Sequence, residues 1–141
     1  MNQGVENSLA GVLEREIARF VEGAAKVAQS SLYRNRRSSP RYHRAVPIMY
    51  MRIDHGPGND ECATLNDVSN DGLAFHCDRG LPIGALLAVK LFWAESEAIR
   101  VPAIVRHCEI TQQGFHIGAE FATGHSEACH LIEQVSGMWY G

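Results

Sequence analysis

The first part of the chain has the apolar pattern of an amphipathic helix. Between residues 8 and 29, apolar side chains recur at steps of three and four, and charged side chains occupy the other side. The apolar positions are Leu9, Leu13, Ile17, Phe20, Ala24 and Val27. Such a stripe must be buried, and two arrangements stay open. The helix packs on the body of its own chain, or it pairs with a second copy in a homodimer.

Residues 30–44 follow neither a helical nor a strand period, and arginine is their commonest charged residue. Pro40 biases Ser39 toward an extended conformation. No acidic residue lies in this segment to pair with its arginines, which are Arg34, Arg36, Arg37, Arg41 and Arg44. The segment therefore reads as a flexible, cationic arm.

From residue 45 the period changes to that of β-strands. Residues 114–121 show it most clearly, with Phe115 and Ile117 on one face and His116 and Glu120 on the other. Turn-length joins separate six candidate strands, at residues 46–53, 61–67, 72–77, 85–93, 98–108 and 114–121. A helix follows at about 126–136. This order predicts a mainly β fold, an antiparallel barrel or sandwich with a helix at each end.

The chain has 141 residues, enough for one domain with its own core. We expect a helical segment at 1–30, the arm at 31–44, and a barrel with its C-terminal helix at 45–141. The net charge is −3, so the overall charge gives no sign of a nucleic-acid binder. The sequence has neither a membrane-spanning apolar run nor a signal-peptide pattern, so we expect a cytoplasmic protein.

Two short segments combine side chains that suit a nucleotide ligand. Arginine guanidinium groups in 36–41 can donate paired hydrogen bonds to phosphate and to the acceptor edge of guanine. In the turn at 67–72, Asp67 can accept from the N–H groups of guanine, Ser69 adds a hydroxyl, and Gly72 permits a tight turn and close approach of a ligand. Donors for phosphate and acceptors for a base edge suit a guanine nucleotide better than a simple anion. Each segment alone is also typical of a solvated linker or of an Asx-type turn.

Other chemistries have weaker support in the sequence. His76-Cys77 and His107-Cys108 are neighbours on predicted strands, so the two members of each pair point to opposite faces and cannot chelate one metal ion. A Ser-His-Asp hydrolase built from Asp67, Ser69 and His76 lacks the G-x-S-x-G turn that positions such a serine. We therefore expect a binding module and not an enzyme, with no metal site and no cofactor.

With these motifs in order, the sequence resembles the PilZ domain family over residues 34–136. The R-x-x-x-R motif of that family matches Arg37 and Arg41, with Arg36 preceding it, and its D/N-x-S-x-x-G motif matches residues 67–72. Residues 118–121 also match the family's G-x-E-F strand ending. The resemblance implies a six-stranded antiparallel PilZ-like β-barrel that binds the bacterial second messenger cyclic di-GMP.

The resemblance also implies roles for individual residues. Arg37 and Arg41 would contact phosphate and guanine, Asp67 and Ser69 would bind the guanine edge, and Gly72 would allow the turn. Arg36 would favour two ligand molecules per site, because an arginine at this position is associated with a stacked ligand pair in the family.

The expected function is that of a receptor or adaptor that changes conformation on ligand binding and signals to an unknown partner protein. In this hypothesis the free arm folds over the barrel when ligand binds, and the N-terminal helix shifts with it. Two alternatives stay open: a PilZ-like interaction module that does not bind nucleotide, and non-specific nucleic-acid binding through the arm, which would collapse with salt.

Overall fold

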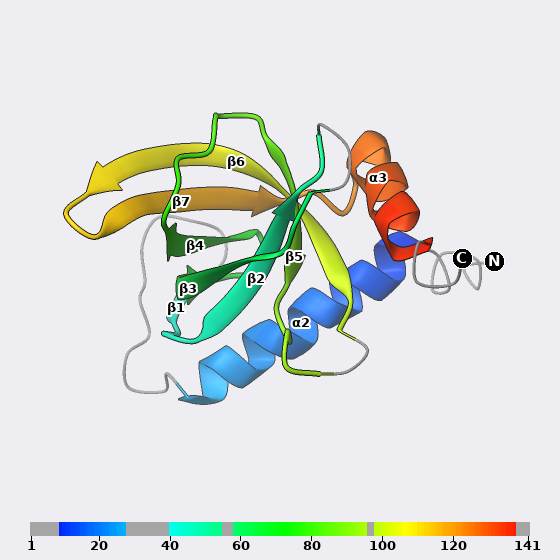
Figure 1. The fold of residues 1–141 in the computed structure, drawn as a ribbon. Coiled ribbons are helices and arrows are strands. Elements are labelled where there is room, and N and C mark those ends of the chain that lie inside the picture. Colours follow the sequence, from blue (N-terminus) through cyan, green and yellow to red (C-terminus); the bar gives the residue numbers. More distant parts are fainter. Residues whose placement is uncertain (1–8, 28–39, 55–57, 96–97, 138–141) are drawn as a thin grey trace.

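The protein folds into a closed six-stranded antiparallel barrel with one additional short strand and two helices (Figure 1). This computed structural model describes residues 9–27, 40–54, 58–95 and 98–137. The elements are α2 (Leu9–Val27), β1 (Tyr42–His43), β2 (Pro47–Arg52), β3 (Glu61–Val68), β4 (Gly72–Cys77), β5 (Leu86–Lys90), β6 (Arg100–Thr111), β7 (Gly114–Phe121) and α3 (Ser126–Gly137). The six predicted strands and both predicted helices are confirmed.

The barrel closes because β3 pairs with β2 at one of its edges and with β4 at the other. Around the barrel the order is β3, β2, β5, β6, β7 and β4, and β4 pairs again with β3. The end of β3 also pairs with β1, which places Tyr42 opposite Val68 and His43 opposite Asp67. The strand β1 lies in the described part of the arginine-rich arm, and its two residues are too few to leave a period in the sequence.

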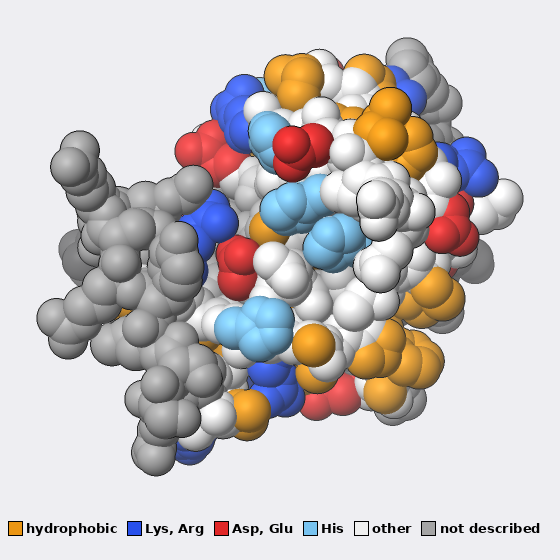
Figure 2. All heavy atoms as spheres, turned by 90° about the vertical axis from the view of Figure 1, so that its left-hand side faces the viewer, with side chains coloured by type: hydrophobic (Ala, Val, Ile, Leu, Met, Phe, Trp, Pro, Cys, Tyr) orange, Lys and Arg blue, Asp and Glu red, His pale blue; other side chains and the backbone are white. Residues whose placement is uncertain are grey.

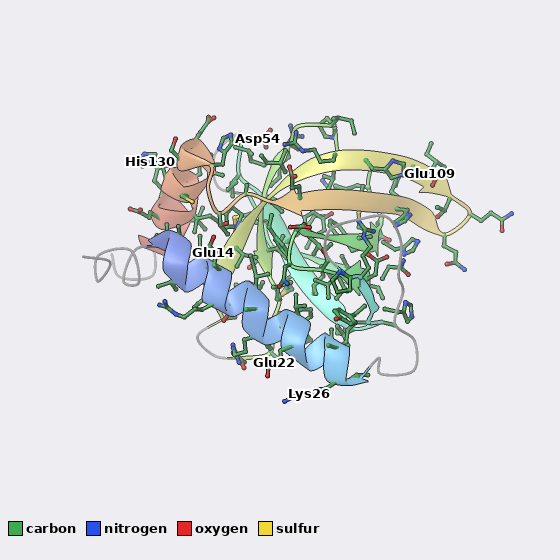
Figure 3. All side chains as sticks on the ribbon, turned by 180° about the vertical axis from the view of Figure 1, so that it is seen from behind. Glu14, Glu22, Lys26, Asp54, Glu109 and His130 are labelled. Atoms are coloured by element: carbon green, nitrogen blue, oxygen red, sulfur yellow. The ribbon has the colours of Figure 1, made fainter. Side chains whose placement is uncertain are left out.

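The helix α2 packs on the barrel of its own chain (Figure 1). Its buried apolar residues join the same core as the inward-facing residues of the strands; on the helix these are Leu13, Ile17, Phe20, Val21 and Ala24. On the opposite face of α2, Glu22 and Lys26 are exposed and point away from the barrel (Figure 3). Most of the apolar stripe of α2 is therefore used within the chain; the exception is Val27, which was predicted to belong to it and is 68% exposed. Within the described residues, nothing supports the alternative of a homodimer through this helix.

The second helix, α3, covers the outer side of the barrel at β2, β5 and β6. On β5, Leu87 and Val89 point into the barrel, whereas Leu86 and Ala88 pack in the cluster that contains Ile132 of α3. Both faces of β5 are thus buried, which explains its continuous apolar sequence. Within the described residues, neither helix has the length and apolar character needed to span a membrane.

Arg100 at the start of β6 is buried, although the alternation of its strand places it on the polar face. Its side chain is 5% exposed and donates two hydrogen bonds to Asp60, at 2.6 Å and 2.9 Å. Lys90 lies 3.4 Å from the same carboxylate. Hydrogen bonding from Arg100 lowers the pKa of Asp60 below its ordinary value. This pair compensates the charge of the buried Arg100 side chain.

Candidate functional site

The two sequence motifs meet through an ion pair between Arg41 and Asp67. Arg41 Nη1 lies 3.1 Å from Asp67 Oδ1, and each side chain is 22% exposed. Arg41 immediately precedes β1, and β1 pairs with the end of β3, where Asp67 lies opposite His43. The pairing of these two strands is what brings the arm to the turn. Within the described residues, Arg41 Nε is buried and has no hydrogen-bond partner.

A β-bulge in β3 turns Asp67 toward the outer surface. The register against β4 shifts between Leu65 and Asp67, so Asn66 is the extra residue. Leu65 and Val68 are both buried in the core, which a regular two-residue period would not allow. The extra residue therefore aims Asp67 away from the core, as bulges next to functional sites often do.

Ser69 and Gly72 shape the turn between β3 and β4. Ser69 is 4% exposed, and its Oγ accepts hydrogen bonds from the backbone N–H groups of Asp71 and Gly72, at 3.1 Å and 3.3 Å. A Cβ at position 72 would collide with the backbone oxygen of Ala119, because β4 and β7 approach closely there. The hydroxyl of Ser69 faces its own turn, not Asp67, so in this structure Ser69 acts on the site by fixing the turn.

A cavity of about 500 Å³ opens beside Arg41 on the outer face of β4, β7 and β6. Small residues of β4 and β7 form much of its lining. Asp67 and Ser69 stand behind the lining, where they hold Arg41 and the turn. The lining residues are Arg41, Asp71, Gly72, Ala74, Arg106, His107, His116, Gly118, Ala119 and Glu120.

Histidine side chains gather on this face of the molecule (Figure 2). The rings of His76 and His116 stack with centroids 4.9 Å apart and planes inclined by 17°, and the ring of His107 meets His116 edge-on at 6.1 Å. His116 Nε2 is buried and has no partner within the described residues. Arg41 Nε and His116 Nε2 are therefore two nitrogens beside the cavity to which a ligand could form hydrogen bonds.

The other predicted site residues, Arg36 and Arg37, lie outside the described residues. Their roles stay predictions. Conversely, the motifs did not single out Asp71, His107 or His116 as site residues. The alternation of β7 signals that His116 and Glu120 face outward, but only the pairing of β7 with its neighbours places them beside Arg41.

The side chains of His76 and Cys77 point to opposite faces of their strand, as expected for neighbouring strand residues. Cys77 is buried in the core and its Sγ donates to the carbonyl oxygen of Arg79, whereas the adjacent His76 stacks on the outer face. Burial raises the pKa of the Cys77 thiol. Within the described residues, the structure contains no group of three or more metal-ligating side chains.

Residues 35–136 match the family model of the PilZ domain. The chain belongs to the PilZ domain family. This confirms the resemblance drawn from the motifs, almost to the residue. A comparison with curated proteins finds no match.

Three solved structures resemble this PilZ chain at low sequence identity. MrkH from K. pneumonia in complex with c-di-GMP is 19% identical with a TM-score of 0.49, over 76% of this chain and 52% of MrkH. The Bacillus subtilis inhibitor of motility, MotI/DgrA, is 13% identical with a TM-score of 0.45, over 76% of this chain and 53% of that one. The PilZ domain of YcgR from Escherichia coli with c-di-GMP is 11% identical with a TM-score of 0.48, over 72% and 88%. This chain thus spans about half the length of MrkH and of MotI/DgrA.

Proposed function

We propose that this PilZ domain is a receptor for cyclic di-GMP, which binds in the cavity between the arginine-rich arm and the turn at 67–72. The observation that supports this most directly is the ion pair between Arg41 and Asp67 beside the cavity. It brings a guanidinium donor and a carboxylate acceptor from two distant motifs to one place. Those are the groups that phosphate and a guanine edge require. Arg37, with Arg36, would complete the cationic side from the arm.

The magnitudes are compatible with a signalling ligand. Four charge-assisted hydrogen bonds contribute about 1.5–3 kcal/mol each. Ordering the arm and restraining the ligand take back several kcal/mol. Base stacking on aromatic rings can add about 1–3 kcal/mol per base, and the imidazole stack of His76 and His116 offers such a surface. Micromolar affinity, about −8 kcal/mol, is therefore attainable.

The proposed signal is a change in the arm that a partner protein recognises. The buried stripe of α2 limits what else can move. Burying four large apolar side chains contributes roughly 6–12 kcal/mol, as much as the ligand itself supplies. We therefore expect the body of α2 to stay docked while the arm between it and β1 closes on the ligand. This is the action of a binding module and not of an enzyme.

Calorimetric titration of cyclic di-GMP tests the proposal. Arg37→Ala and Arg41→Ala should each lower the affinity about tenfold or more, because each removes a charge-assisted hydrogen-bond donor. Arg44→Ala is the matched control: Arg44 lies in the same arm but lines a different groove, beside Phe92 and Trp93, so its loss should matter less. Wild-type affinity in Arg37→Ala would refute the site assignment. Binding that collapses with salt and extends to any polynucleotide would favour the nucleic-acid alternative, and the absence of any binding would favour the interaction module.

A further inference from the structure

A second arginine–carboxylate pair lines the cavity on the side away from Arg41. Arg106 donates from Nε and Nη2 to Glu120 Oε1, at 3.1 Å and 2.9 Å. Both side chains are 56% exposed, and both line the cavity. The R-x-x-x-R and D-x-S-x-x-G motifs contain neither residue, and Glu120 is the glutamate of the G-x-E-F strand ending. The cavity is therefore flanked by two pairs of the same chemistry, each made of one guanidinium and one carboxylate.

Each pair depends on a β-bulge. In β6 the register against β7 shifts between Val105 and His107, so Arg106 is the extra residue. Val105 is fully buried, whereas Arg106 and His107 are both exposed, so the bulge keeps two consecutive side chains at the surface. The bulge in β3 does the same for Asp67. Two irregularities on separate strands thus direct the same type of pair to the same cavity.

The two pairs are separated by two strands but border one cavity. In the barrel, β7 and β4 lie between β6 and β3. Arg41 of the first pair and both residues of the second pair line the same cavity. The residues of β4 and β7 that line the cavity between them are mostly small: Gly72, Ala74, Gly118 and Ala119.

We propose that Arg106 and Glu120 bind a second guanine base at the far side of the cavity. This inference rests on the proposed function. A guanidinium can donate two hydrogen bonds to guanine O6 and N7, and a carboxylate can accept from the guanine N1–H and N2–H groups. Adenine carries a donor at position 6 and an acceptor at N1, so the same pair disfavours it. The base belongs either to the second half of one cyclic dinucleotide or to a second ligand molecule.

A role in binding can be separated from a role in stability. An exposed ion pair contributes little to folding, so Arg106→Ala and Glu120→Ala should leave the melting temperature nearly unchanged. The control is Arg79→Ala. Arg79 pairs with Glu61 at 3.0 Å, has a side chain that is 65% exposed, and does not line the cavity.

The experiment is calorimetric titration of the full chain and these variants with cyclic di-GMP and with cyclic di-AMP. Arg106→Ala and Glu120→Ala should each lower the affinity for cyclic di-GMP about tenfold and reduce the preference for guanine over adenine. Arg79→Ala should match the wild type. A stoichiometry that halves in Glu120→Ala assigns the base to a second ligand molecule, and an unchanged stoichiometry assigns it to the same molecule.

Two negative results are distinguishable. If Arg41→Ala loses binding while Glu120→Ala and Arg106→Ala keep wild-type affinity and base preference, the second base site is wrong and the proposed function stands. If the wild type binds no cyclic di-GMP, both proposals fall.

Discussion

Arg41 and Asp67 lie 26 positions apart in the chain and form an ion pair at 3.1 Å. One belongs to the arm and the other to the end of β3, and the short β1–β3 pairing joins them. The Arg41 donor is thus held beside the cavity. A guanine that hydrogen-bonds to Asp67 must share or replace the bond to Arg41, so this pair is the first contact that binding would change.

Asp67→Ala should lower the affinity for cyclic di-GMP about tenfold or more, because it removes the acceptor for the base edge and releases Arg41. The free energy of unfolding should fall by only about 1–2 kcal/mol, since the pair is partly exposed. Asp54→Ala is a matched control: Asp54 pairs with Arg52 at 2.7 Å with similar burial, and Arg52, unlike Arg41, does not line the cavity. Titration and urea unfolding of both variants separate the two effects. Equal affinities in the two variants would contradict the role of Asp67.

Gly72→Ala should destabilise the fold by about 1–3 kcal/mol, the usual cost of forcing extra atoms into a packed site. The added Cβ meets the backbone of β7 at Ala119, which cannot move without opening the barrel. Gly23→Ala is the comparison, because a Cβ there meets nothing within 4 Å and alanine favours the helix. Urea denaturation of both should show a loss for one and a gain of about 0.5–1 kcal/mol for the other. A Gly72→Ala protein as stable as the wild type would refute the proposed steric limit.

Asp60→Asn should destabilise the protein by about 2–4 kcal/mol at neutral pH, because it leaves the buried Arg100 without its carboxylate. The pKa of Asp60 is lowered in the folded state from its ordinary value of 3.8. The stabilisation from its charged form is therefore complete above about pH 4 and is lost as the pH falls through the lower, folded pKa. The difference in unfolding free energy between wild type and variant should narrow below pH 4. A difference that stays constant down to pH 2 would show that the Arg100 pair does not set this pKa.

Hydrogen exchange should report the closure of the arm. On addition of cyclic di-GMP, we expect slower exchange for residues 30–44 and little change in α2, whose apolar face is in the core. Mass spectrometry of peptides from these two segments measures both. Unchanged exchange in the arm at saturating ligand would rule out the proposed closure of the arm, and faster exchange in α2 would show that the helix itself is released.

The elements of the fold follow from local patterns. The spacing of Leu13, Ile17 and Phe20 predicts α2, and the alternation of residues 114–121 predicts β7, because helices and strands have fixed side-chain periods. The motif positions likewise predict Arg41, Asp67 and Gly72 as members of one site, and the structure places these three residues close together. Local pattern does not reveal β1, since two residues carry no period.

What local pattern cannot supply is the direction of side chains at irregular positions and the partner of each strand. The six barrel strands, the two helices and the two motifs could all be predicted from residue patterns. Three features required the packed fold: the docking of the α2 stripe on its own barrel, the burial of Arg100 against Asp60, and the bulges that turn Asp67 and Arg106 outward. The physical reason is that a bulge and an ion pair depend on which strand lies alongside, and that is settled only when distant segments pack together.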